Sequence, residues 1–181
     1  VGGDLSNNVT RSVCAGQWGV TLAPEPGCRI PKMFDAALDG EVKGLYCQGE
    51  DIAQSAPNTQ HVETALSSME CLVVQDIFLN ETAKFAHVFL PGASFLEKDG
   101  TFTNAERRIS RVRKTMPPLS GKADWEGTMA LANALGCKFQ YDHPSDIMDE
   151  IARLTPTFNG VAYARMDKLG SIQWTGNDHT H

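Results

Sequence analysis

The stretch CLVVQDIFLNETAKFAHVFLP, residues 71–91, decides the fold. Its first apolar run, residues 72–74, stops at the polar pair Gln75-Asp76, and its second run, residues 88–90, stops at Pro91. Short β-branched runs that end at polar or turn residues are typical of buried strands. In an open parallel α/β sheet, ligands bind just beyond the carboxyl ends of the strands. We therefore expect the chemistry at Gln75, Asp76 and the turn that follows.

Working outward toward the N-terminus, the sequence predicts a strand–helix–strand unit. A strand at residues 42–47 runs into the polar sequence at residues 49–51, and a helix then starts near Asn58, which can serve as its N-cap. Strand, helix and strand within about 30 residues is the length of a right-handed βαβ unit, whose strands are parallel neighbours. One edge of the sheet should therefore gather four polar residues: Glu50, Asp51, Gln75 and Asp76.

The remaining start and stop signals of helices and strands predict an α/β, three-layer Rossmann-like domain with a parallel sheet. We expect residues 1–28 to form an irregular lead-in, residues 29–140 the Rossmann-like domain, and residues 141–181 a C-terminal helix and linker. Helices are expected at residues 31–40, 124–135 and 145–154. The second of them has an apolar stripe of Trp125, Met129, Ala132 and Leu135, and the third has Ser145 as its N-cap. A third strand is expected at residues 87–90, a long polar loop at 92–104, and a further strand at 107–114.

Composition excludes several classes of function. The chain has 181 residues and a net charge of -6, which argues against a broad electrostatic footprint for nucleic acid or an anionic membrane surface. No apolar run approaches the roughly 18 residues of a membrane span, and no signal-peptide pattern starts the chain, so we expect a cytoplasmic protein. The five cysteines show no metal or disulfide spacing, and Cys47 and Cys71 are expected to be small buried hydrophobes.

The pair Gln75-Asp76 admits two interpretations. It could cap the strand and hydrogen-bond the next loop, since Asp is an ordinary turn former. Alternatively, an amide and a carboxylate at a strand exit suit a base edge that presents donors and acceptors, such as guanine or a pterin. No dinucleotide-binding G-x-G-x-x-G motif follows the first strand and no P-loop motif occurs. An ordinary dinucleotide fold or P-loop is therefore disfavoured.

Three more candidates lie toward the C-terminus. Lys98, in a loop flanked by glycine, is either a surface cation or a contact for a phosphate or ring oxygen. The basic segment, residues 107–114, could suggest nucleic acid, but no aromatic residues interleave with its five cations. We favour a strand whose cations face a buried anion or a partner. Asp124 is expected to start a helix as its N-cap, where it could also contact a ligand.

Six motifs follow one another along the chain: GED at 49–51, VQDIFLNETA at 74–83, VFLP at 88–91, EKDGTFTNAERR at 97–108, ADW at 123–125 and GSIQW at 170–174. In this order and spacing they resemble the molybdopterin oxidoreductases, and most closely the catalytic (alpha) subunit of cytoplasmic, NAD-linked formate dehydrogenases. The resemblance spans roughly residues 17–174.

The resemblance implies that this chain is a fragment, one of two Rossmann-like cofactor domains of a much larger subunit. In that family, two molybdopterin guanine dinucleotides hold molybdenum or tungsten, and this domain binds one of them. The implied cofactor-binding residues are Glu50, Asp51, Gln75, Asp76, Lys98 and Asp124, with Thr82, Asn104 and Arg107 as weaker candidates. No catalytic residue or metal ligand is expected within the chain.

The resemblance also implies what lies outside the chain. The intact enzyme would oxidise formate to carbon dioxide, and two electrons would pass through [4Fe-4S] centres and iron-sulfur/diaphorase subunits to NAD. The implied partners are the remaining domains of the alpha subunit and those subunits. The sequence departs from the family at His87, where Asp is usual, and at Ile52, where Pro is usual; the family's metal-ligating Cys or selenocysteine has no counterpart here.

Two alternatives stay open at this point. The chain could be a stand-alone module that binds a guanine nucleotide or a partner protein without catalysis. It could also be a fragment of a related molybdoenzyme such as nitrate reductase, which differs in substrate residues that this chain does not contain.

Overall fold

A computed structural model describes residues 6–175. The chain divides into two compact units. The parallel unit comprises Gly27–Ser94 and Pro118–Asp124. The antiparallel unit comprises Val1–Pro26, Phe95–Pro117 and Trp125–His181. Each unit has its own three-stranded sheet, and the two are described in turn.

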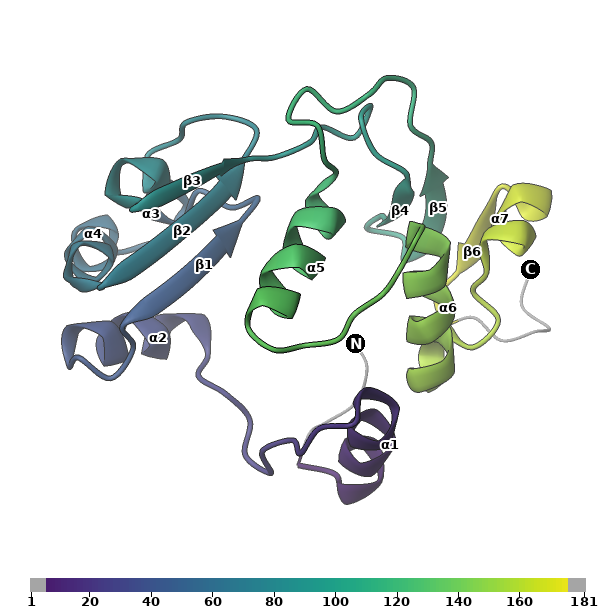
Figure 1. Cartoon of the computed structure of the whole chain (residues 1–181), viewed down its shortest axis with the longest axis horizontal. Coiled ribbons are helices and arrows are strands. Elements are labelled where there is room, and N and C mark those ends of the chain that lie inside the picture. The colour runs from purple at the N-terminus through teal and green to yellow at the C-terminus, as the bar shows by residue number, and fades with distance from the viewer. Residues whose placement is uncertain (1–5, 176–181) are drawn as a thin grey trace. The chain divides into compact units, whose positions relative to one another are not determined.

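The parallel unit contains residues 71–91, from which the strands were predicted. Its sheet has the order β1-β2-β3 with every neighbouring pair parallel, which confirms the predicted α/β class and parallel sheet (Figure 1). The elements are α2 (Ile30–Leu38), β1 (Gly44–Gln48), α3 (Ile52–Ser55), α4 (Thr59–Ser68), β2 (Cys71–Asp76), the 3-10 helix η1 (Thr82–Phe85) and β3 (Val88–Pro91).

Local sequence explains where the helices of this unit begin. Proline lies in the first turn of α2, where the missing N–H group has no helical partner to lose. The side chain of Asn58 accepts a hydrogen bond from the His61 N–H at 3.3 Å and caps α4, as predicted. The apolar faces of both helices, with Phe34 on α2 and Leu66 on α4, are buried in one core.

Side-chain alternation divides the parallel sheet into an apolar face and a polar face. Cys47 pairs with Val74 across β1 and β2, and both are buried in the core with the helices. The next pair along, Gln48 and Gln75, must point the other way because successive side chains alternate across a strand. The polar face therefore carries glutamine side chains beside the strand exits.

The antiparallel unit has the sheet order β4-β5-β6 with both neighbouring pairs antiparallel. Its core gathers Ile109, Met148, Val161, Tyr163, Met166 and Ile172. The elements are α1 (Asn8–Trp18), β4 (Gly100–Thr103), β5 (Arg108–Val112), α5 (Asp124–Ala134), α6 (Pro144–Leu154), η2 (Pro156–Phe158), α7 (Tyr163–Leu169) and β6 (Ser171–Gln173); the first residue of α5 belongs to the parallel unit.

Several local predictions were wrong. Part of the supposedly irregular lead-in is helix α1, which Asn7 caps by accepting from the Val9 N–H at 2.9 Å. The long polar loop contains strand β4. The N-cap of α6 is His143 and not Ser145, because the His143 ring accepts the Ser145 N–H.

Burial differs from the sequence prediction at two places. Helix α5 has no buried residue, so its apolar stripe does not face a core within the part of the chain that the structure describes. Cys47 is buried as predicted, whereas Cys71 is exposed. Within residues 6–175, no helix combines the length and the apolar character that crossing a membrane requires.

The core of the parallel unit gives a test of the fold. Leu72 on β2 is fully buried, whereas Leu119 in the same unit is 96% exposed. We expect Leu72→Ala to lower the free energy of unfolding by about 2–5 kcal/mol, because the cavity adds to the lost transfer free energy. Leu119→Ala should change it by less than about 0.5 kcal/mol. Urea denaturation of both variants measures the difference, and equal effects would contradict this core.

Candidate functional site

The exits of the three parallel strands lie side by side. The Gly49 N–H donates to the Gln75 carbonyl at 2.9 Å, and the Gly92 N–H donates to the Asp76 carbonyl at 2.8 Å. These bonds continue the β1-β2 and β2-β3 ladders just beyond the strands. We call residues 49–51, 75–76, 91–93 and Asp124 the strand-exit rim.

The β1 exit is held by Asp51. One oxygen of its carboxylate accepts the Thr82 N–H at 2.9 Å and the Thr82 hydroxyl at 2.7 Å, and the other accepts the Glu81 N–H at 3.4 Å. Burial opposes ionisation, but these hydrogen bonds and the charge of Lys84 together lower the pKa of Asp51. Asp51 is therefore an ionised anchor for the start of η1.

Thr82 completes this anchor from inside the protein. Its side chain is fully buried, and its hydroxyl accepts the Ala53 N–H at 3.0 Å while donating to Asp51. A hydroxyl has one donor and two acceptor positions. Thr82 thus uses its single donor for the hydrogen bond to Asp51. Through its bond with Ala53, it connects α3 with η1.

The β2 exit is organised by Asp76. Its carboxylate accepts the Ile77 N–H at 2.6 Å and the Asn80 side-chain amide at 2.9 Å, and Asn80 in turn accepts the Ala83 N–H at 2.9 Å. This is the loop-capping interpretation of Asp76 that the sequence left open. The same bonds fix residues 77–79, whose three apolar side chains are at least half exposed.

The β3 exit approaches both neighbours closely. A Cβ atom added at Gly92 would lie 3.1 Å from the Asp76 carbonyl carbon and 3.3 Å from an Asp124 oxygen. Asp124 holds the next residue as well, since its Oδ1 accepts the Ala93 N–H at 2.8 Å. A larger residue at position 92 would therefore require these neighbours to move by a few tenths of an ångström.

Gln75 lies at the centre of the rim on the polar face of the sheet. Its side chain is only 5% exposed. Its Oε1 accepts the Tyr46 hydroxyl and the Gln48 amide, the latter at 3.3 Å, and its Nε2 lies 3.4 Å from Asp124 Oδ1. Sequence reasoning missed Tyr46 and Gln48, although their alternation with Leu45 and Cys47 was the signal that could have found them.

Negative charge dominates the electrostatics of the rim. Glu50 is exposed and accepts a hydrogen bond from the Ser55 hydroxyl. Burial, together with the charges of Glu50, Asp76 and Asp51, raises the pKa of the Cys47 thiol to about 11. The Cys47 thiol is thus neutral at physiological pH and donates to the Glu50 carbonyl at 3.2 Å. It is not a nucleophile in this setting.

The chemistry that this rim offers is acceptance of hydrogen bonds. Carboxylates only accept, and each has about four lone-pair positions, so an oxygen bonded to one N–H group keeps further capacity. Ligand groups with adjacent N–H donors suit such oxygens, whereas a phosphate would be repelled. Among residues 6–175, no group of three or more His, Cys, Asp or Glu side chains lies arranged to hold a metal ion.

Six of the nine predicted cofactor-binding residues are in the parallel unit at or behind the rim: Glu50, Asp51, Gln75, Asp76, Thr82 and Asp124. The other three belong to the antiparallel unit. Lys98 precedes β4, whereas Asn104 and Arg107 form the turn between β4 and β5, with the Asn104 side chain accepting the Arg108 N–H at 2.9 Å. Strand β4 lies between Lys98 and that turn.

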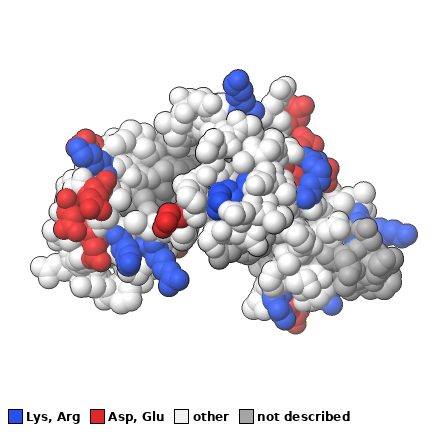
Figure 2. Space-filling view, turned by 90° about the horizontal axis from the view of Figure 1, so that it is seen from below, with Lys and Arg blue, Asp and Glu red and all other residues white. Residues whose placement is uncertain are grey.

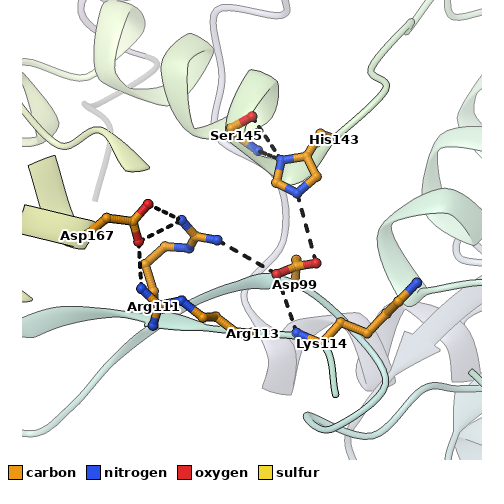
Figure 3. A network of polar contacts seen from close by, with 7 residues as sticks. All are labelled: Asp99, Arg111, Arg113, Lys114, His143, Ser145 and Asp167. Carbon is orange, nitrogen blue, oxygen red and sulfur yellow. Dashed lines mark hydrogen bonds and ion pairs between the residues drawn. The ribbon is translucent and has the colours of Figure 1, made fainter. Parts of the chain in front are cut away.

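The basic segment pairs within its own unit. Arg111 bonds Asp167 at 3.1 Å and contacts Asp99 at 3.7 Å, and Arg113 bonds Asp167 at 2.6 Å (Figure 3). The Arg111 guanidinium also stacks over the Tyr163 ring, with 3.8 Å to its centroid. The cations therefore face anions. These anions are partly exposed, whereas a buried anion or a partner was predicted. On the face seen in Figure 2, basic side chains are dispersed among acidic ones.

Comparison with known proteins shows the family. Residues 6–134 match the model of the family described as Molybdopterin oxidoreductase. The "Probable oxidoreductase" of Bacillus subtilis is 45% identical over 161 residues, which are 88% of this chain and 16% of that protein. A "Putative formate dehydrogenase" of Staphylococcus aureus is 47% identical over 159 residues, which are 87% of this chain and 16% of that protein.

A solved structure shares the fold. Acetylene hydratase from Pelobacter acetylenicus matches with a TM-score of 0.65 at 18% identity, over 93% of this chain and 24% of that one. The chain thus spans about a sixth of the length of the curated relatives it matches.

The Asp51 anchor predicts a pH-dependent stability. Because the folded-state pKa of Asp51 lies below its unfolded value of about 3.9, its contribution is present above that value and is lost as pH falls through the folded pKa. We expect Asp51→Asn to be less stable than wild type at pH 7, with the difference shrinking below about pH 4. Denaturation at several pH values measures this, and a constant difference would contradict the anchor.

The close approach at Gly92 predicts a second stability effect. Gly92→Ala should lower the free energy of unfolding by about 1–3 kcal/mol, because backbone and Asp124 must move to admit the methyl group. Gly44→Ala on β1 is the matched control, since its Cβ would meet only the Cys71 carbonyl oxygen, at 3.6 Å. Thermal or urea unfolding compares them, and a Gly92→Ala variant as stable as the control would rule out the tight exit.

Proposed function

The chain belongs to the molybdopterin oxidoreductase family, and we propose that it is the part of a longer formate dehydrogenase catalytic subunit that binds the guanine end of one molybdopterin guanine dinucleotide. The observation that carries this proposal is the strand-exit rim, where parallel strands gather carboxylate and amide oxygens at one edge. Relatives named as formate dehydrogenases favour formate over nitrate as the substrate of the longer protein.

The rim fits a guanine base by its hydrogen-bonding character. Guanine presents an N1–H and an exocyclic amino group side by side, and a carboxylate accepts two such donors together. Asp124 and Glu50 are the proposed contacts, since neither is buried. Asp51, Asp76 and Thr82 are proposed to hold the exits in place, because their hydrogen bonds go to backbone and side chains of the following loops.

The acidic rim is poorly suited to the pyrophosphate of the proposed cofactor. The pyrophosphate carries negative charge and would be repelled by Glu50, Asp51, Asp76 and Asp124. Lys98, Asn104 and Arg107, from the antiparallel unit, offer the donors that phosphate and ring oxygens need. On the family resemblance, we propose that they are also cofactor contacts.

In the longer protein, the molybdenum or tungsten held by two such cofactors would supply the redox chemistry. Formate would give carbon dioxide, a proton and two electrons, and the electrons would pass through iron-sulfur centres and a diaphorase partner to NAD. These steps, and a cytoplasmic location, remain proposals that rest on the family resemblance. The described residues of this chain bind and orient the cofactor.

Nucleotide binding tests the proposal on the chain itself. We expect the 181-residue chain to bind GDP weakly and more tightly than ADP, measured by calorimetry. Asp124→Asn should weaken GDP binding about tenfold, which corresponds to about 1.4 kcal/mol for a hydrogen bond to a charged group. Asp39→Asn, an exposed carboxylate at the end of α2, is the control and should leave binding unchanged.

Two results would contradict the proposal. Equal affinity for GDP and ADP would remove the guanine assignment. Formate-dependent dye reduction by the isolated chain would contradict its role as a cofactor-binding part without catalytic residues.

A further inference from the structure

We propose that Tyr46 is a positioning residue, which acts through the Gln75 amide to set the orientation of the Asp124 carboxylate. This inference rests on the proposed function, because it treats Asp124 as the contact for the guanine base. Tyr46 lies on β1, Gln75 on β2, and Asp124 at the start of α5. Three segments far apart in the sequence are thus connected at one edge of the sheet.

The polarity of the connection is set at the Asp124 end, because a carboxylate only accepts hydrogen bonds whereas a tyrosine hydroxyl can donate or accept. The Tyr46 hydroxyl donates to Gln75 Oε1, and the Gln48 amide donates to the same oxygen at 3.3 Å. The Gln75 amide therefore presents its NH2 group to Asp124, whose Oδ1 lies 3.4 Å away, and its oxygen faces the Tyr46 hydroxyl.

The opposite amide orientation is excluded by the same neighbours. The two ends of a glutamine amide differ only in their hydrogen-bonding character, so neighbouring donors and acceptors decide its orientation. If the amide were turned over, its oxygen would face the Asp124 carboxylate, and two acceptors would meet. Because Gln75 is 5% exposed, water could not relieve this contact.

Asp124 receives two donors on one oxygen through this arrangement. The Ala93 N–H at 2.8 Å fixes Oδ1 from the β3 exit, and the Gln75 NH2 group approaches the same atom from β2. Two donors from different directions restrict rotation of a carboxylate about its terminal bond. The plane of the Asp124 carboxylate is therefore defined before a ligand arrives, which lowers the cost of binding.

Removal of one hydroxyl group tests the connection. We expect Tyr46→Phe to weaken GDP binding by the full chain about fivefold. The matched control is Tyr141→Phe, which removes a hydroxyl that donates to Glu150 at 2.9 Å in the antiparallel unit, and it should leave the affinity unchanged. Circular dichroism verifies that each variant is folded.

A double-mutant cycle separates positioning from a general structural effect. In an Asp124→Asn background, Tyr46→Phe should change GDP affinity by less than twofold, because the group through which it acts has already been altered. If the fold losses of GDP affinity in the two single variants multiply in the double variant, Tyr46 does not act through Asp124 and the proposal fails. Gln75→Met, which keeps the side-chain length but removes the amide, should reproduce the Tyr46→Phe effect.

Hydrogen exchange gives a readout that needs no nucleotide. The Ala93 amide proton is bonded to Asp124 Oδ1, so looser positioning of Asp124 should speed its exchange with solvent. We expect faster exchange at Ala93 in Tyr46→Phe and no change in Tyr141→Phe. Wild type that fails to bind GDP would contradict the proposed function alone, whereas unchanged Ala93 exchange in Tyr46→Phe would overturn the positioning role.

Discussion

The site depends on the parallel register of β1, β2 and β3, which brings three chain exits to one edge of a sheet. Each exit must then turn away, and each turn leaves backbone N–H groups that need acceptors. Asp51 accepts at the start of η1, Asp76 accepts from the loop after β2, and Asp124 accepts from Ala93 after β3. Three carboxylates thus stabilise three turns, and the acidic character of the edge follows from the backbone's requirement for acceptors.

This requirement changes the interpretation of acidic residues at strand exits. Position alone marks Asp51, Asp76 and Asp124 equally as ligand contacts. The hydrogen bonds separate them: Asp51 bonds both the backbone and the hydroxyl of buried Thr82, and Asp76 bonds a backbone N–H and a loop amide. A residue that holds a turn can be essential to a site without contacting its ligand, because it fixes the groups that do.

Much of the parallel unit could be predicted because its signals are local. Apolar runs, the Asn58 cap and the βαβ spacing each depend on a few neighbouring residues. The antiparallel unit was harder to predict. Strand β6 has three residues, and its pairing with β5 joins Ile109 to Ile172 across more than 60 positions. No local pattern encodes such a pairing. The His143 cap was missed because a histidine ring accepts a backbone N–H less commonly than Ser or Asp does.

The difference between the units extends to charge. In the antiparallel unit, Arg111 and Arg113 pair with Asp167, and Arg111 also approaches Asp99 and stacks on Tyr163. Arg111 and Arg113 of the basic segment therefore have acidic partners within their own unit. In the parallel unit, the exit carboxylates Asp51, Asp76 and Asp124 each accept a backbone N–H group. A carboxylate has about four acceptor positions, so such an edge suits a ligand group that presents N–H donors.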